Sequence, residues 1–112
     1  MDCIFCRIAA GEIPCSKVYE TDEVLAFRDL NPQAPIHVLI IPKRHIASLQ
    51  ALTAADDELL GKLFLAAREI AKQLGVDETG YRIVSNVGEA AGQSVKHLHL
   101  HFISGKTLKW DN

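Results

Sequence analysis

The feature that most constrains the fold of this chain is a strict alternation of histidine and apolar residues near its C-terminus. The stretch SVKHLHLHFI, residues 94–103, holds three of the five histidines. Successive side chains of a β-strand point to opposite faces, so the histidines share one face while the leucines and phenylalanine between them pack into the core. A slip of one residue would reverse the two faces, so the apolar residues also fix the register. The histidines of this predicted strand are His97, His99 and His101.

The rest of the chain predicts an α+β domain. A long helix over 53–74 has one apolar face, a capping-box-like start at Thr53 with Asp56, and a stop at Gly75. The run over 37–41 is almost wholly apolar and ends at Pro42, which predicts a central strand packed on both faces. A short helix and three further strands are predicted over 4–11, 18–20, 24–28 and 81–86. This order indicates an antiparallel sheet with the main helix on one face.

Length, charge and cysteine content narrow the class of protein. The 112 residues fit one domain, and a net charge of −2 gives no broad electrostatic surface for nucleic acid. No apolar stretch is long enough to span a membrane, and the opening residues do not form a secretory signal. Three cysteines in such a chain argue against a disulfide framework. We therefore expect a cytoplasmic protein.

Three interpretations of the histidine row are open. The first is a solvated strand face without special chemistry. The second is a metal site, since imidazoles at alternate strand positions can bind one ion. The third is nucleophilic and acid–base catalysis, in which one imidazole attacks while its neighbours handle protons near neutral pH.

The polar residues around the row favour chemistry at an anionic oxygen such as a phosphate. Gly92–Ser94 places a permissive backbone, an amide and a hydroxyl directly before the histidines. His37 begins the central strand and would bring a fourth imidazole to the same face if the two strands are neighbours. Asp29 and Asn86 lie at strand ends and suit sugar hydroxyls, although each alone is equally typical of a turn or cap.

The row resembles the His-x-His-x-His signature of the histidine triad (HIT) nucleotide hydrolases and transferases. The segment NPQAPIHVLIIPK, residues 31–43, is similar to the central segment of the Hint branch, and Gly92–Ser94 and Trp110 also match it. The likeness runs from about Ile4 to Trp110 in matching order.

The resemblance implies a single HIT domain over residues 1–112, whose five-stranded sheet joins that of a second chain in a homodimer. It implies an enzyme without a catalytic cofactor that binds a purine nucleotide such as AMP or GMP and cleaves a substituent from its α-phosphate. At the matching positions His99 is the nucleophile, which forms a nucleotidyl-histidine that water hydrolyses. Ser94 donates to the phosphate or to the leaving atom. The residues that orient and polarise are His37, His97 and His101.

The same resemblance implies the nucleotide contacts. Asp29 accepts hydrogen bonds from the ribose hydroxyls, and His99 and His101 face the phosphate. Asn86 holds the phosphate and leaving group together with the backbone of Gln93, Ser94 and Val95. The apolar purine slot, whose members equally suit a plain core, includes Phe5, Ile8, Phe27 and Leu30.

The N-terminal Cys-x-x-Cys sets this chain apart from the Hint members compared with it, and it resembles bacterial members that bind a structural zinc. In that arrangement Cys3, Cys6, His45 and His97 form a tetrahedral Cys₂His₂ site, and His97 is then structural rather than catalytic. The alternative is two small buried cysteines and a surface histidine. Cys15 has no expected partner and is interpreted as a small loop residue.

Two other functions stay open at this point. The same chemistry suits hydrolysis of dinucleoside polyphosphates, and a nucleotide-binding scaffold with incidental activity is the alternative from another class. In Hint-like proteins the C-terminal tail can reach the partner's active site, so Trp110 is interpreted either as a determinant of leaving-group specificity or as an aromatic packed at the interface.

Overall fold

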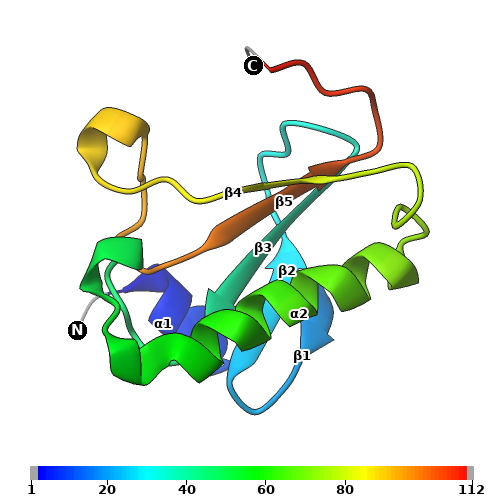
Figure 1. Cartoon of the computed structure of the whole chain (residues 1–112). Helices are drawn as coiled ribbons and strands as arrows, with labels where there is room; N and C mark the ends of the chain where they lie inside the picture. The colour runs from blue at the N-terminus through cyan, green and yellow to red at the C-terminus, as the bar shows by residue number, and fades with distance from the viewer. Residues whose placement is uncertain (1–2, 111–112) are drawn as a thin grey trace.

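A five-stranded antiparallel sheet runs through the centre of the computed structural model, which describes residues 3–110 (Figure 1). The strand order is β1-β2-β3-β5-β4, and every neighbouring pair is antiparallel. This confirms the predicted fold class. Among the described residues, no helix combines the length and the apolar character needed to cross a membrane. The strands are β1 (Lys17–Glu20), β2 (Val24–Arg28), β3 (Ile36–Pro42), β4 (Arg82–Val84) and β5 (Leu100–Ser104).

The long helix α2 (Asp57–Gln73) covers one face of the sheet. It follows a single 3₁₀ turn, Ala54–Asp56, whose capping box joins Thr53 to Asp56 as the sequence predicts. Its apolar stripe packs on the residues of β3 and β5 that point to the same side, and this contact forms the main core. The helix residues fully buried there are Leu63, Ala66, Ala67, Ile70 and Ala71.

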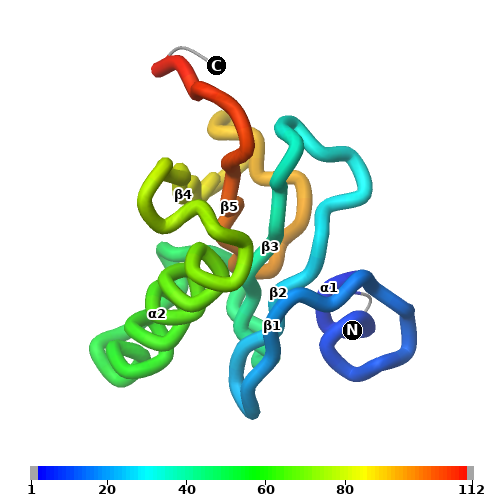
Figure 2. Tube along the Cα trace, turned by 90° about the vertical axis from the view of Figure 1, so that its right-hand side faces the viewer, coloured from blue at the N-terminus to red at the C-terminus, as the bar shows by residue number. Residues whose placement is uncertain are grey.

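The short helix α1 (Ile4–Ala9) lies on the opposite face, as the two sides of Figure 2 show. Phe5 is its buried residue, and it packs with Phe27 of β2 at a ring separation of 5.6 Å. The central strand β3 serves both cores because its side chains alternate: Val38 and Ile40 face α2, whereas Leu39 and Ile41 face α1. The prediction of a strand buried on both faces is confirmed.

Three element boundaries differ from the sequence predictions. β3 includes Pro42, which ends the strand opposite Val24. β4 is shorter than the predicted 81–86, because the side-chain amide of Asn86 donates to the carbonyl oxygen of Ala91 and turns the chain away from the sheet. β5 begins only at Leu100, so the first two histidines of the row, His97 and His99, precede the strand.

The chain before β5 is held by contacts other than a strand ladder. The Leu98 N–H donates to the carbonyl of Ile46 at 2.6 Å, and the His97 carbonyl accepts from the ring of His99. These groups are therefore not available to a neighbouring strand. The alternation of buried and half-buried residues runs from Leu100 to Ser104. The His97 ring before it is buried against α1, where it packs on Phe5 at a centroid distance of 5.9 Å.

Candidate active site

Three imidazoles come together on the α1 side of the sheet, at the pairing of β3 with β5. His37 on β3 lies across from Ile103, which places its ring beside that of His101 at a centroid distance of 5.1 Å. The His99 and His101 rings are 5.0 Å apart. The expectation that His37 adds a fourth imidazole near the row is confirmed. His37 and His99 are buried rather than solvated.

A chain of hydrogen bonds fixes the tautomers of His37 and His101. The backbone N–H of Gln33 donates to His37 Nδ1 at 2.9 Å, so this nitrogen carries no proton. The proton of neutral His37 is then on Nε2, which donates to His101 Nδ1 at 2.9 Å. The proton of neutral His101 is consequently on Nε2, where it can serve a ligand. Asp29 Oδ2 lies 3.4 Å from His37 Nε2 on the same side.

His99 has the opposite tautomer. Its Nδ1 donates to the carbonyl oxygen of His97 at 2.7 Å, which leaves an unprotonated Nε2 with its lone pair. The rings of His99 and Phe5 pack in a T-shaped arrangement at a centroid distance of 5.2 Å. His99 is therefore a buried imidazole whose one free nitrogen is nucleophilic.

Burial favours the uncharged forms of His101 and His37 near neutral pH. It lowers the pKa of His101 to about 4, with smaller contributions in the same direction from His99 and His37 and an opposing one from Asp29. Burial is also the main reason that the pKa of His37 lies below its ordinary value, and Asp29 again opposes it. Neutral rings keep the tautomers described above.

A cavity of about 280 Å³, here called the aromatic cavity, opens beside His99 and His101. All members of the predicted purine slot line it, together with Asp29, Ser94 and Val95. Leu30 lies at its rim, where it is 94% exposed. The predicted residues that line it are Phe5, Ile8, Phe27, Asp29, Leu30, Ser94, Val95, His99 and His101.

The cavity wall also contains residues that the sequence did not single out. Ile13 and Cys15 approach it from the loop before β1, and Leu39 from the middle of β3. The sequence places Leu39 in a strand that is buried on both faces. Its position on the α1 face of β3 is the signal that could have assigned it to the cavity wall. The loop residues carry no periodic signal.

Four predicted residues lie outside the aromatic cavity, and one of them, His37, lines a second hollow beside His101. Gln93 donates its side-chain amide to the carbonyls of Ala47 and Val95 and accepts from the Gly88 N–H, so it shapes the loop before the row. Asn86 is likewise engaged with the loop. The ring of His97 lines neither the aromatic cavity nor the second hollow described next. The hydrogen bond from His99 is accepted by the backbone carbonyl oxygen of His97 and not by its ring.

A second hollow, of about 370 Å³, lies on the other side of His101 and is called the basic shelf below. Of the described residues that line the two cavities, His101 is the one they share. The shelf is lined by Gln33, His37, Arg82, Val84, Asn86, His101, Ile103 and Lys106.

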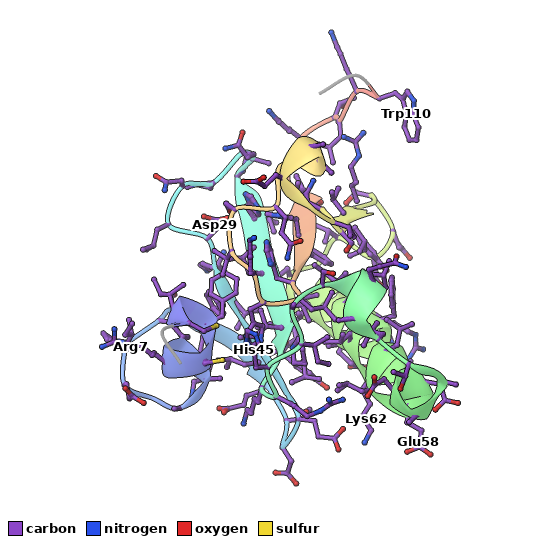
Figure 3. The ribbon with its side chains drawn as sticks, turned by 90° about the vertical axis from the view of Figure 1, so that its left-hand side faces the viewer. Arg7, Asp29, His45, Glu58, Lys62 and Trp110 are labelled. Carbon is purple, nitrogen blue, oxygen red and sulfur yellow. The ribbon has the colours of Figure 1, made fainter. Side chains whose placement is uncertain are left out.

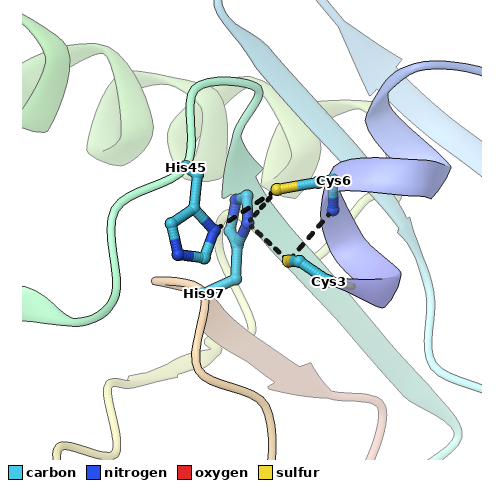
Figure 4. A group of neighbouring side chains, drawn as sticks. All are labelled: Cys3, Cys6, His45 and His97. Atoms are coloured by element: carbon cyan, nitrogen blue, oxygen red, sulfur yellow. Dashed lines mark hydrogen bonds between the residues drawn. The ribbon is translucent and has the colours of Figure 1, made fainter. Parts of the chain in front are cut away.

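A separate cluster of two thiols and two imidazoles joins α1 to the sheet (Figure 4). Its four ligand atoms all lie within 4.8 Å of one another. His97 Nδ1 is 3.3 Å from Cys3 Sγ and 3.5 Å from Cys6 Sγ. His45 Nδ1 is 3.3 Å from Cys6 Sγ. The sequence prediction that these four residues meet is confirmed.

The donor set fits a tetrahedral metal ion. Zinc bound to one sulfur and one nitrogen would separate these atoms by about 3.6 Å, close to the separations found here. The Nε2–H of buried His97 donates to the Pro42 carbonyl at 2.8 Å, which points the Nδ1 lone pair into the cluster. Burial, and after it the neighbouring Cys3, raises the pKa of the Cys6 thiol to about 11. This shift disfavours the thiolate form, and a bound cation would favour it again.

The sheet, the tautomerically ordered imidazoles and the adjoining cavity define a histidine triad protein. Residues 10–108 match the model of the HIT domain family. The chain therefore belongs to the HIT domain family.

Relatives and solved structures agree with this assignment. An uncharacterized HIT-like protein of Synechococcus elongatus is 52% identical over 109 residues, which cover 97% of this chain and 95% of the relative. The crystal structure of a HIT family hydrolase from Legionella pneumophila is 48% identical, with a TM-score of 0.96 and 97% of each chain covered. A histidine triad nucleotide-binding protein from Candida albicans is 33% identical, with a TM-score of 0.83, covering 98% of this chain and 88% of that one.

Proposed function

We propose that this protein hydrolyses purine nucleoside phosphoramidates, cleaving an amine from the α-phosphate through a nucleotidyl-His99 intermediate. The observation that carries the proposal is the free Nε2 of His99, beside a cavity that Phe5, Phe27 and aliphatic side chains line together with polar residues such as Asp29 and Ser94. The names of the Legionella hydrolase and the Candida nucleotide-binding protein support the same reaction class.

The aromatic cavity suits a nucleoside monophosphate such as AMP or GMP. Phe5 and Phe27 offer flat apolar surfaces to a purine ring. Asp29 fixes one carboxylate oxygen by accepting from the Asn31 N–H at 2.8 Å, and its other oxygen accepts from the ribose hydroxyls. The α-phosphate then lies at the histidines, where His101 Nε2–H and the Ser94 hydroxyl donate to its oxygens.

The reaction proceeds in two displacements at phosphorus. The lone pair of His99 Nε2 forms an N–P bond while the bond to the leaving amine breaks, and the amine keeps that electron pair and takes a proton from solvent. The positive charge that develops on His99 is stabilised by its Nδ1–H bond to the His97 carbonyl. Water then attacks phosphorus, loses a proton to solvent, and releases the nucleotide and neutral His99.

Zinc in the Cys₂His₂ cluster has a structural part in this proposal. Cys3, Cys6, His45 and His97 would hold the ion, which supplies a cross-link between α1 and the sheet when bound. α1 contributes Phe5 to the aromatic cavity, so the cross-link keeps that wall in place. Reduced thiols of this kind accord with a cytoplasmic location.

The proposed assembly is a homodimer joined at β4. This strand pairs with β5 on one side and forms an edge of the sheet in the described chain (Figure 1). Pairing of two such edges would produce one continuous sheet and protect both edges. Trp110 is 96% exposed and projects from the tail (Figure 3), as expected if it completes the partner's site. Sedimentation equilibrium should give twice the chain mass, and a monomer would contradict this assembly.

Mass spectrometry of protein quenched during turnover tests the mechanism. With adenosine 5′-phosphoramidate, we expect a mass gain of one adenylyl group that is absent from His99→Asn. That variant should lose turnover by about three orders of magnitude or more while it still binds AMP. Persistence of the adduct in His99→Asn would assign the nucleophile elsewhere. A protein that binds AMP without any adduct or turnover would instead be a nucleotide-binding module.

A further inference from the structure

We infer that the basic shelf is a subsite for negatively charged leaving groups, so that the preferred substrates carry a carboxylate or phosphate on the departing amine. The inference rests on the proposed function. It adds the chemical class of the leaving group and names Lys106 as the residue that selects it.

The shelf is built by the sheet itself. In the strand register, Ile103 of β5 lies opposite both Arg82 of β4 and His37 of β3. Val84 of β4 lies opposite His101 of β5. Side chains directly opposite one another share a face, so all five point to the α1 side. The residues packed on α1 come from β2 and β3, so the β5–β4 part of this face stays open.

The walls of the shelf are positively charged. Arg82 and Lys106 line it together with the amide side chains of Gln33 and Asn86, and none of the described residues lining it is acidic. Arg82 is oriented by donating from Nη2 to the Lys109 carbonyl at 2.7 Å. Lys106 is exposed immediately after β5. Asp29 lines the aromatic cavity, and its Oδ2 lies 3.4 Å from the Nε2 of His37, which is part of the shelf.

The position of the shelf makes it the exit from the reacting phosphorus. A nucleoside fills the aromatic cavity up to His99 and His101, and His101 is also part of the shelf. A substituent on the α-phosphate therefore crosses His101 into the shelf. A rival hollow of about 610 Å³ beside α1 carries Arg7 and Lys96, but neither His99 nor His101 lines it.

Three adenosine 5′-phosphoramidates with leaving amines of similar length test the inference: 4-aminobutyramide, which is neutral, 4-aminobutyrate, and 3-aminopropylphosphonate. We expect kcat/KM for the anionic substrates to exceed that of the neutral one about fivefold at low salt, and the ratio to fall as ionic strength rises. A larger ratio for the phosphonate would assign phosphate as the preferred group, and a larger ratio for 4-aminobutyrate would assign a carboxylate.

Variants locate the preference. Lys106→Gln should lower the anionic-to-neutral ratio about threefold. Lys72→Gln, on α2 across the sheet, makes the same change in net charge and should leave the ratio unaltered. An unaltered ratio in Lys106→Gln, or a reduced ratio in Lys96→Gln, would overturn the inference. So would a native protein without preference.

Binding separates this inference from the proposed function. Calorimetry with His99→Asn measures the dissociation constants of the same three compounds without turnover, and the anionic ones should bind more tightly unless Lys106 is also replaced. Absence of turnover in the native protein, with this binding preference present, would refute the hydrolase and leave the subsite standing. Turnover of all three compounds with equal affinities would refute the subsite alone.

Discussion

His37 Nε2 lies 2.9 Å from His101 Nδ1, across the β3–β5 pair, and one backbone N–H at Gln33 decides the direction of that hydrogen bond. Because Gln33 occupies His37 Nδ1, the proton of His37 must point at His101. The proton of His101 is thereby directed away from His37. In the proposed reaction, a side chain that touches no substrate thus sets the hydrogen-bonding character of one that does.

Replacement of His37 tests this relationship. In His37→Ala, His101 loses its partner at Nδ1, and we expect kcat to fall about 10- to 100-fold because the donor at Nε2 is no longer fixed. The dissociation constant for AMP should change less than threefold, since His37 does not line the aromatic cavity. Steady-state kinetics and calorimetry measure the two quantities. An unchanged kcat, or an equal loss of affinity, would show that His37 does not act through His101.

The low pKa of His101 predicts a pH-dependent stability. The folded-state pKa is about 4, below the ordinary value of 6.5, so between these values the unfolded chain binds a proton that the folded chain does not. The free energy of unfolding should therefore decrease as pH falls from 6.5 to 4. His101→Gln removes this titration and keeps a hydrogen-bonding side chain, so its Tm should fall less over that window. Parallel Tm profiles for the two proteins would contradict the assignment.

Removal of one cluster thiol tests the metal site. Cys6→Ser should abolish stoichiometric zinc and lower Tm by about 5 °C or more, because α1 loses its cross-link to the sheet. Cys15→Ser is the matched control, since Cys15 lies outside the cluster. Elemental analysis and thermal unfolding provide the measurements. Native protein that contains no zinc when purified without chelators would count against the site.

Gly105 predicts a steric effect that can be separated from backbone strain. Its φ is +93°, and a Cβ there would lie 2.9 Å from Pro35 Cβ. Gly88 has a similar φ of +83° with nothing within 4 Å of the added atom. We expect Gly88→Ala to cost about 1 kcal/mol, and Gly105→Ala to cost about 1–3 kcal/mol more. The free energy of unfolding of both variants is measured by urea denaturation. Equal losses in the two variants would mean that Pro35 moves aside at no cost in stability.

The sequence predicted those parts of the fold that depend on local periodicity. The alternation in β5, the unbroken apolar run of β3 and the stripe of α2 each reflect burial against a neighbour, so their types and order were readable. The ends of β4 and β5 were not, because a strand ends where its partner or its hydrogen bonds end. The start of β5 depends on the backbone hydrogen bond from Leu98 to Ile46, which lies 52 residues away in the chain.

The candidate site was predictable in its residue types but not in the roles of its polar groups. The resemblance implies a phosphate contact for the backbone of Gln93, and the structure adds that the side-chain amide holds backbone groups of the loop. An amide side chain serves either purpose equally well, and the three-dimensional arrangement of the loop decides between them. Cys15 was missed for a related reason: an apolar loop residue becomes part of a cavity wall only through the path of the chain around it.

The short segment from His97 to Lys106 contains a proposed metal ligand, His99 with its free nitrogen, His101 with its hydrogen bond to His37, and the lysine of the basic shelf. Insertion or deletion of a single residue within it would move every later side chain to the opposite side of the sheet and dismantle these features together. Evolution can therefore alter the segment by exchanging side chains one at a time but not by changing its length.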